Sequence, residues 1–422
     1  MAGRPDAGTD RRRERPKDRK QRIGEHAARL FTERGFHAVR MEDIAAADGI
    51  TVRALYRHYA HKQALLAHVV RAGQDAYRAA FEAAAGPWPG PDCTDGLLAG
   101  LIGAATHSRG YAVLRRRESR YLLPEDRARV VGRLFGLVTR TAEQIGREPP
   151  APGADAGFTA ELRAWALVSA LAGPAEQQVA APRSELAGVL DAAARALLAV
   201  PVAVPAEATA PARALMASRR ERVLAAAAAA FHRDGYPEVG TDDIGREAGI
   251  VGPALYRYFP TKLDILVTLC RRHDERSTLE TSRALRAGSP REVLSGLVEG
   301  LVRLALEDPD LVAVGQTEVL HLPGTLAEQL LRNRSDRVAE WRGCLREVRP
   351  DLPAPAARVL VASAMAVVES VAQVPRVTRR GGVGRALVEL ATAVLLAPLP
   401  APGCPAVRPR GGSGATRPGP RG

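Results

Sequence analysis

The sequence predicts an all-α protein built from two similar helical units in tandem, and three observations support this fold class. Aromatic residues make up only 4% of the 422 residues whereas hydrophobic residues reach 46%, so we expect a core of Ala, Leu and Val, as in helical proteins. The length corresponds to two or three domains. In addition, a segment near the N-terminus recurs 200 residues later.

The recurring segment covers residues 22–66 and 222–266 without a gap, and sixteen of its 45 positions are identical. Lysine makes the match specific, because the chain has only four lysines and two of them are Lys62 and Lys262, at equivalent positions. Weaker downstream matches pair Glu118 with Glu318 and Leu122 with Leu322. The repeat therefore indicates a duplicated unit.

Composition divides the chain around this repeat. Residues 200–211 are rich in Pro, Ala and Val, which is typical of a linker. The expected parts are a basic tail (1–16), a first helix-turn-helix head (17–66), a first helical body (67–200), a linker (201–213), a second head (214–266), a second body (267–398) and a basic, disordered tail (399–422).

Each head begins with a helix, expected over residues 23–34 and 223–234, which ends at Gly35 or Gly235 as a left-handed cap. A second helix is expected over residues 42–48 and 242–248. Thr241 is a good N-cap for its copy. Met41 stands at the same position of the first repeat, so we expect that helix to lack a cap at a cost of about 1 kcal/mol.

A glycine turn, Gly49 or Gly249, leads into a third helix. Thr51 is expected to cap this helix in the first repeat, and Gly252 at the N-cap with Pro253 at the first helical position in the second. Two short helices joined by a tight turn form a helix-turn-helix, whose second helix enters the major groove of DNA. The outward positions carry polar, basic and aromatic groups that suit phosphates and base edges: Val52, Arg53, Tyr56, Arg57 and His58.

Residues 54–62 (ALYRHYAHK) and 254–262 (ALYRYFPTK) resemble the DNA-binding signature of the TetR family of transcriptional regulators, as do Asp43-Ile44 with Gly49-Ile50 and their repeats. The match is specific because Leu-Tyr-Arg with a spaced Lys occurs twice. It covers about 90 residues directly. The resemblance implies two units, each with a three-helix DNA-binding head and a helical body that carries an effector pocket and a dimer interface.

The resemblance also implies particular contacts with DNA. In the first head they fall on Thr51, Val52, Arg53, Tyr56, Arg57 and His58, with Lys62 on a phosphate. In the second head they fall on Gly252, Pro253, Tyr256, Arg257, Tyr258 and Lys262, with Thr241 as the cap on the phosphate side. The alternative roles are core packing for the tyrosines and solvated surface charge for the lysines.

The bodies offer candidates for an effector pocket, since such pockets are mostly apolar with few polar groups. The candidates are Tyr111, Tyr121, Phe135, Trp165, Glu318, His321 and Trp341, with core packing as the competing role for each. Catalytic motifs of the GxSxG, HExxH or Walker type are absent from the sequence, so an enzyme is not expected. The four scattered cysteines form no metal motif, and we predict no metal site and no cofactor.

Charge points toward a polyanionic partner. The formal net charge is +13, residues 1–22 hold nine Lys/Arg against four Asp/Glu, and residues 397–422 hold four Arg and no acid. Basic ends of this kind either bind nucleic acid or keep the chain soluble. The first twenty residues lack an apolar signal core, and residues 359–368 are shorter than the roughly 18 residues of a membrane span. We therefore expect a cytoplasmic protein without a membrane partner.

The sequence thus predicts a transcriptional repressor that binds a double-stranded DNA operator and is released by an unknown small-molecule effector. One chain already contains two bodies, so they can pair internally as a pseudo-dimer, or two chains can pair as a homodimer with four heads. The alternative function is an effector sensor or interaction module in which one or both heads no longer bind DNA. The second head keeps that alternative open, because residues 213–266 hold eight Lys/Arg against seven Asp/Glu.

Overall fold

The structure, a computed structural model, describes residues 16–84, 93–146, 155–202, 204, 218–250 and 252–399. These residues form helices and turns, with no β-strand among them. The first half contains α1 (Pro16–Arg34), α2 (Met41–Asp48), α3 (Val52–Tyr56), α4 (Lys62–Ala84), α5 (Cys93–His107), α6 (Arg109–Arg117), the 3₁₀ helix η1 (Ser119–Tyr121), α7 (Pro124–Ile145), α8 (Ala156–Glu176) and α9 (Arg183–Ala199).

The second half repeats this order of elements. It contains α10 (Arg219–Asp234), η2 (Tyr236–Glu238), α11 (Thr241–Ala248), η3 (Gly252–Arg257), α12 (Lys262–Ala284), α13 (Pro290–Glu307), α14 (Pro309–Thr317), η4 (Val319–His321), α15 (Gly324–Val348), α16 (Ala354–Val371), α17 (Pro375–Thr378) and α18 (Val383–Leu395). The offset of 200 residues holds far beyond the sequence repeat: α12 and α14 end 200 residues after α4 and α6. The predicted all-α tandem architecture is therefore confirmed.

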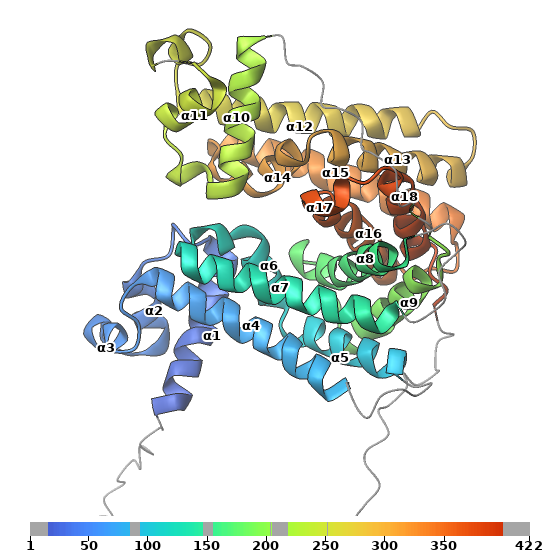
Figure 1. The fold of residues 1–422 in the computed structure, drawn as a ribbon, viewed down its shortest axis with the longest axis horizontal. Coiled ribbons are helices and arrows are strands. Elements are labelled where there is room, and N and C mark those ends of the chain that lie inside the picture. The colour runs from blue at the N-terminus through green and yellow to red at the C-terminus, as the bar shows by residue number, and fades with distance from the viewer. Residues whose placement is uncertain are drawn as a thin grey trace, which may run out of the picture.

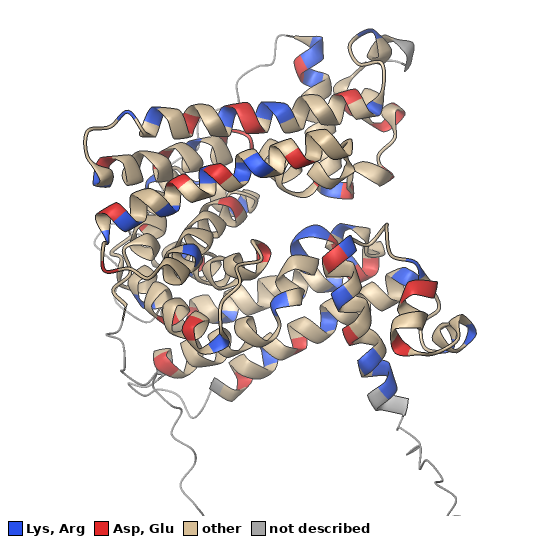
Figure 2. Ribbon diagram, turned by 180° about the vertical axis from the view of Figure 1, so that it is seen from behind, with Lys and Arg blue, Asp and Glu red and all other residues tan. Residues whose placement is uncertain are grey.

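The two halves lie one above the other, and both heads are on the same side of the molecule (Figure 1). Each head has its own small core, centred on Phe31 and Ile44 in the first and on Phe231 and Ile244 in the second. Lys and Arg lie on the head helices of both halves, whereas the helices between the halves carry few charges (Figure 2). The heads thus present charge to solvent.

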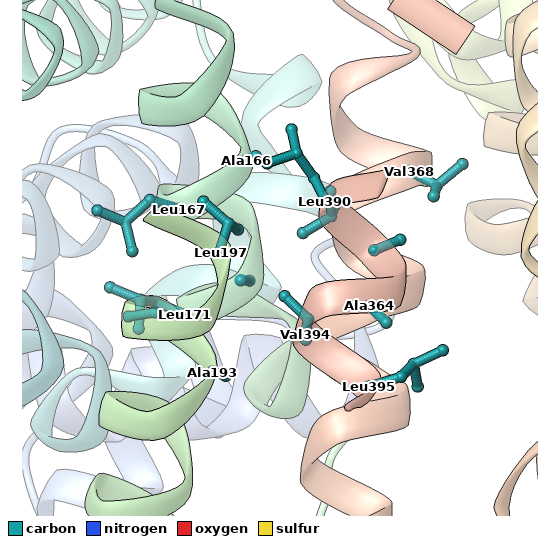
Figure 3. Packing of buried hydrophobic residues seen from close by; sticks show 14 of the residues in the cluster. Ala166, Leu167, Leu171, Ala193, Leu197, Ala364, Val368, Leu390, Val394 and Leu395 are labelled. Carbon is teal, nitrogen blue, oxygen red and sulfur yellow. The ribbon is translucent and has the colours of Figure 1, made fainter. Parts of the chain in front are cut away.

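The bodies share one core. α8 packs against its own counterpart, α16, and α9 packs against α16 and α18. Ala166 and Leu197 of the first half and Leu390 and Val394 of the second belong to one buried cluster (Figure 3). The approach is closest at Gly173, where an added Cβ would lie 2.5 Å from the carbonyl oxygen of Ala362. Four helices therefore join the halves through a continuous apolar interface.

The helix α16 is long and apolar enough to cross a membrane by length and composition alone. The sequence prediction underestimated its apolar length, because it considered only the uncharged stretch. In the structure 72% of its 18-residue window is buried inside the protein. This helix is thus the central element of the four-helix interface.

The expected linker begins later than predicted. Val202 and Val204 are buried in the shared core, and the N–H of Asp155 donates to the carbonyl oxygen of Val204 (3.2 Å). Apolar side chains at these alternate positions pack on the first body because an extended segment points them to one face. The tails at 1–15 and 400–422, and residues 205–213 of the linker, lie outside the described residues.

Candidate nucleic-acid interface and effector cavities

The first helix of each helix-turn-helix begins one residue earlier than predicted. Thr241 is the first residue of α11 and Met41 the first of α2, so neither is the cap. Instead, a carboxylate three positions into each helix accepts the N–H of the preceding residue: Asp243 from Gly240 (3.0 Å) and Asp43 from Arg40 (2.8 Å). The first helix thus lacks a side-chain cap as expected, but so does the second, because neither Arg40 nor Gly240 makes a side-chain cap hydrogen bond. The expected difference between the heads at this position is therefore absent.

The tight turn that follows is present in both heads. Gly49 and Gly249 adopt left-handed backbone conformations with φ of 68° and 65°. This conformation costs about 1–2 kcal/mol for a residue with a Cβ, which explains the glycine. Gly35 and Gly235 also have positive φ, but Gly235 has an extended ψ of 144° and so is not the left-handed cap that we expected.

The second helix differs between the heads. In the first, Thr51 caps α3 as predicted, and its Oγ1 accepts the N–H of Ala54 (3.2 Å). In the second, η3 is a 3₁₀ helix and Gly252 is its first residue rather than the preceding cap. Pro253 follows at once and lacks an N–H to donate.

The predicted contact residues line an exposed face in both heads. Tyr56 and Tyr256 are 49% and 50% exposed, which excludes the alternative that they are core residues. Arg53, Arg57 and Arg257 are exposed, and none of the described residues makes a hydrogen bond or ion pair with their side chains. These guanidinium groups are available to an external anion.

The side chains of the other predicted contact residues are partly enclosed by the protein or bonded within it. Val52 is half-buried against the first head's core, and Tyr258 packs against the second head's core. His58 is half-buried. The hydroxyl of Thr241 lies 3.1 Å from that of Tyr256, which orients the tyrosine on the exposed face. Met41 cannot make this contact in the first head.

The structure gives the two repeated lysines an internal role. The Nζ of Lys62 donates to the carbonyl oxygens of Phe36 (2.7 Å) and Val39 (2.9 Å) and lies 4.2 Å from the centre of the Phe36 ring. The Nζ of Lys262 donates to those of Tyr236 (2.9 Å), Pro237 and Val239 (2.9 Å). An ammonium has three donors, so these contacts use two of them in Lys62 and three in Lys262. The phosphate contact implied by the resemblance stays a prediction.

In each half a buried glutamate also contacts the loop that the lysine contacts, the one after the first helix of the head. The N–H of Phe36 donates to Oε2 of Glu118, and the N–H of Tyr236 donates to Oε2 of Glu318, both at 3.2 Å. Burial raises the pKa of Glu118. These glutamates directly follow α6 and α14, so each adds a hydrogen bond from body to head to the apolar packing of these helices on the head. Glu318 was predicted as a pocket residue, and in the structure its carboxylate contacts the second head.

The two halves also meet below the heads, in a one-sided contact. Arg120 of the first half forms an ion pair with Glu318 and donates to Oγ1 of Thr317 (3.2 Å). Arg127 lies 3.6 Å from Asp234. The repeat equivalents of these arginines, at positions 320 and 327, are Leu and Ala. The first half therefore supplies the cations and the second half the carboxylates.

A cavity of about 160 Å³ lies in the first body, between α4, α6 and α7. Its apolar wall consists of Tyr77, Phe81, Tyr111, Leu134 and Leu137. Charged side chains from α4 and α7 stand at its edge: Asp75, Arg78, Arg133 and Arg140. This combination of an aromatic wall and a few polar groups is typical of a site for a small molecule.

The seven predicted pocket residues do not share one cavity. Tyr111 lines the first-body cavity, and Trp341 lines a second-body cavity of about 60 Å³. Phe135 and Trp165 contact each other edge to face in the core (5.2 Å between ring centres). Tyr121, Glu318 and His321 lie where the bodies meet the heads. Sequence alone could not separate these places, because each residue type suits a core and a pocket equally.

The sequence prediction missed the polar residues of the second-body cavity. His273, Arg334 and Arg337 line it together with Glu369. A signal that could have identified three of them is that His273, Arg334 and Arg337 replace glycine or leucine 200 positions earlier. Among the described residues no cluster of three or more His, Cys, Asp or Glu could hold a metal ion.

The fold and these exposed faces define an all-helical protein with two helix-turn-helix heads. The family model of bacterial regulatory proteins, tetR family, matches residues 23–69 and 223–269, one segment in each head. Each head thus matches this family model, whereas the matched segments do not extend into the bodies.

Relatives of known name match over shorter stretches. The HTH-type transcriptional repressor KstR of Mycolicibacterium smegmatis is 36% identical over 92 residues, 22% of this chain and 45% of the relative. The HTH-type transcriptional activator FasR of the same species is 35% identical over 68 residues, 16% of this chain and 31% of the relative. The chain thus spans less than half the length of these two relatives. Both are named as transcriptional regulators, not as enzymes.

A solved structure that matches part of the chain is that of a TetR-family transcriptional regulator from Bordetella parapertussis 12822. It is 23% identical, and the match covers 43% of this chain and 95% of that chain with a TM-score of 0.39.

Proposed function

We propose that this protein is a transcriptional regulator that binds a double-stranded DNA operator with two heads of a single chain, and that it acts as a repressor released by a small-molecule effector. The contact of α8 with its own counterpart, α16, carries this proposal. Contact between equivalent surfaces is the mark of a twofold interface. Here both surfaces belong to one chain, so the internal pair takes the place of two subunits.

A contact at the centre of the molecule supports the same pairing. Arg116 donates to Oε1 of Gln316, its own repeat equivalent, and to Oε2 of Glu369 (3.2 Å). A residue can meet its equivalent only near the axis that relates the two halves. The internal pair would leave no second copy of the four-helix surface for another chain.

The heads would read DNA through their exposed residues. In the first head these are Arg53, Tyr56 and Arg57, and in the second Tyr256 and Arg257. Pro253 stands where the first head has Arg53, and an Arg contact with guanine discriminates by about 1–3 kcal/mol. We therefore infer an operator with unlike half-sites rather than a palindrome. Lys62 and Lys262 would serve the heads indirectly, by holding the loops.

The first-body cavity is the proposed effector site. Tyr111 lies on α6, and the same helix leads to Glu118, which accepts the N–H of Phe36 in the head. An effector that favours one position of α6 would therefore favour one position of the head. Release from DNA then follows as a population shift, limited by the difference in effector affinity between the two positions. A cytoplasmic location without a cofactor suits this function.

The test is the mass of the native protein in solution, measured by light scattering, alone and with duplexes selected from a random library. We expect a monomer of 44.9 kDa that binds one duplex with two unlike half-sites. Steep weakening of binding with salt would accompany phosphate contacts. A particle of twice that mass on a palindromic footprint would contradict the internal pair, and failure to select any duplex would favour a sensor module instead.

A further inference from the structure

The boundary between the halves contains a charged cluster to which the proposed function assigns no ligand. It consists of four guanidinium groups and three carboxylates at the boundary between the halves: Arg115, Arg116, Arg334 and Arg337 with Glu176, Glu369 and Asp274. In a protein interior, an excess charge of this kind is costly unless it is paired.

All but one of the cations are paired. Glu176 accepts from Arg115 (2.8 Å) and Arg116 (2.6 Å), and Glu369 accepts from Arg116 (3.2 Å). Arg337 pairs with Asp274 (2.6 Å) on α12. These contacts occupy all three carboxylates.

Arg334 is the cation that remains. Among the residues that the structure describes, none forms a hydrogen bond or an ion pair with it. Burial lowers its pKa, attraction by Glu369 raises it, and the nearby Arg116 and Arg337 lower it further. The guanidinium is thus charged, largely enclosed and without a direct partner.

Arg334 lies between two cavities. One, of about 60 Å³, is in the second body, and the other, of about 30 Å³, is lined by residues of both halves. Gln316 and Glu369 line both cavities as well. The carbonyl of Gln316 accepts from Arg116, and no described residue accepts from its amide nitrogen. Two kinds of N–H donor therefore face the same enclosed space.

Apolar side chains form much of the remaining wall of the larger cavity: Leu297, Leu301, Leu304, Val338, Trp341 and Met365. His273, Ser277, Glu280 and Thr281 line it as well. A cavity needs about 10–15 Å³ to hold one water, so the larger one has room for a group of a few heavy atoms. N–H donors together with apolar side chains match a small molecule with an anionic head and a short hydrocarbon part.

We propose that the second body binds a small carboxylate, with the carboxylate on Arg334 and Gln316 and the hydrocarbon part against Trp341 and Met365. The inference rests on the proposed function only in treating the body as a regulatory domain. The two halves then respond to different ligand classes, since the first-body cavity has an aromatic wall. Carboxylate binding would also affect the ion pair between the halves, because Glu369 contacts Arg116 of the first half.

The experiment measures binding of straight-chain carboxylates from acetate to hexanoate to the full chain without DNA, by isothermal titration calorimetry. The primary amides of the same lengths are matched probes of equal size without charge. A charge-assisted hydrogen bond contributes about 1.5–3 kcal/mol, so we expect the best carboxylate to bind at least about tenfold more tightly than its amide. Equal binding of the two, or binding of neither, would overturn the proposal.

Two variants on one helix locate the site. Arg334→Met removes the charge and keeps the length, whereas Arg332→Met removes an exposed charge two residues away. We expect Arg334→Met to lose the preference for carboxylate over amide and to melt at the same or a higher temperature, because an unpaired buried charge is removed. Arg332→Met should bind as the unaltered protein does.

The melting temperature keeps the proposal open to refutation. If Arg334→Met lowers it strongly, Arg334 is a paired structural residue and the proposal fails. Because the titration contains no DNA, its result does not depend on the heads: carboxylate binding without DNA binding would refute the proposed function alone, and DNA binding without a carboxylate site would refute this inference alone.

Discussion

The two bodies have the same helices but oppositely lined cavities. Four wall positions of the first-body cavity are aromatic or aliphatic, and all four are polar or charged 200 residues later. The exchanges pair Tyr77 with Ser277, Phe81 with Thr281, Leu134 with Arg334 and Leu137 with Arg337. The framework of a duplicated unit can thus be kept while the chemistry of its interior diverges, because helix packing depends on other faces of the same helices.

In both halves a glycine makes room for a large side chain where two helices cross, but the glycine lies on a different helix in each half. In the first half Gly73 leaves room for Tyr111, and a Cβ added there would lie 2.4 Å from the tyrosine ring. In the second half Gly315 leaves room for His273, at 2.3 Å. The large side chain comes from α6 in one half and from α12 in the other. Where one helix carries a large side chain, the neighbouring helix carries a glycine, so the total side-chain volume at the crossing is kept.

The largest difference between the halves should lie at the buried glutamates. Glu318 is fully buried and paired with Arg120, whereas Glu118 has only Arg117 at 4.0 Å. Breaking a buried pair costs about 3–5 kcal/mol, so Glu318→Gln should lower the free energy of unfolding by about that amount. Glu118→Gln should cost about 1–2 kcal/mol, as for a lost hydrogen bond.

Urea unfolding of both variants measures this difference. Equal losses for Glu118→Gln and Glu318→Gln would contradict the one-sided contact below the heads. Arg120→Met, which removes the partner of Glu318, should destabilise the protein in a non-additive way with Glu318→Gln because the two residues share one interaction.

His273 should make stability depend on pH. Burial lowers its pKa to about 3, so the unfolded chain binds more protons than the folded one between about pH 3 and 6.5. Stability should therefore be complete above pH 6.5 and fall as the pH falls, by about 3 kcal/mol at pH 4. His273→Gln should flatten this slope, whereas His107→Gln, at an exposed position, should leave it unchanged. An unaltered slope in His273→Gln would contradict the burial of this imidazole.

A smaller effect should test the crossing of α4 with α6. Gly73→Ala should lower the free energy of unfolding by about 1–3 kcal/mol, because its Cβ overlaps Tyr111. Adding Tyr111→Leu, the residue of the second half, should restore part of the loss. Gly103→Ala is the control, since nothing lies within 4 Å of its Cβ. Thermal unfolding measures the stability of all three variants. An unchanged stability of Gly73→Ala would contradict the close packing of Gly73 against Tyr111.

The smallest effect should appear at one half-site only. Arg53→Ala should weaken binding to selected duplexes by about 1–3 kcal/mol and relax the sequence preference at one half-site. Competition between duplexes altered at either half-site measures this. Arg195→Ala, a charge change on α9, should leave the preference unchanged. Equal weakening by Arg53→Ala for every duplex would mean that Arg53 contacts phosphate and does not read a base.

Local patterns predicted the heads well. The second helix begins one residue before its predicted start, at Met41 and Thr241, and Gly49 and Gly249 are left-handed as expected. Helix starts, tight turns and the exposed tyrosines depend on residues within a few positions. The helix caps were harder to predict, because Thr241 is the first residue of α11 and the carboxylate of Asp243 accepts the N–H of the residue before it.

The sequence by itself determined the duplication, the helical class and the exposed face of each helix-turn-helix, because these follow from the spacing of residues along one segment. Only the tertiary structure decided that Lys62 and Lys262 hold loops, that Glu118 and Glu318 join body to head, and which pocket candidates line a cavity. These roles depend on partners 23 to 82 positions away. The pairing of α8 with α16 likewise depends on apolar surfaces brought together from distant parts of the chain, which no local pattern specifies.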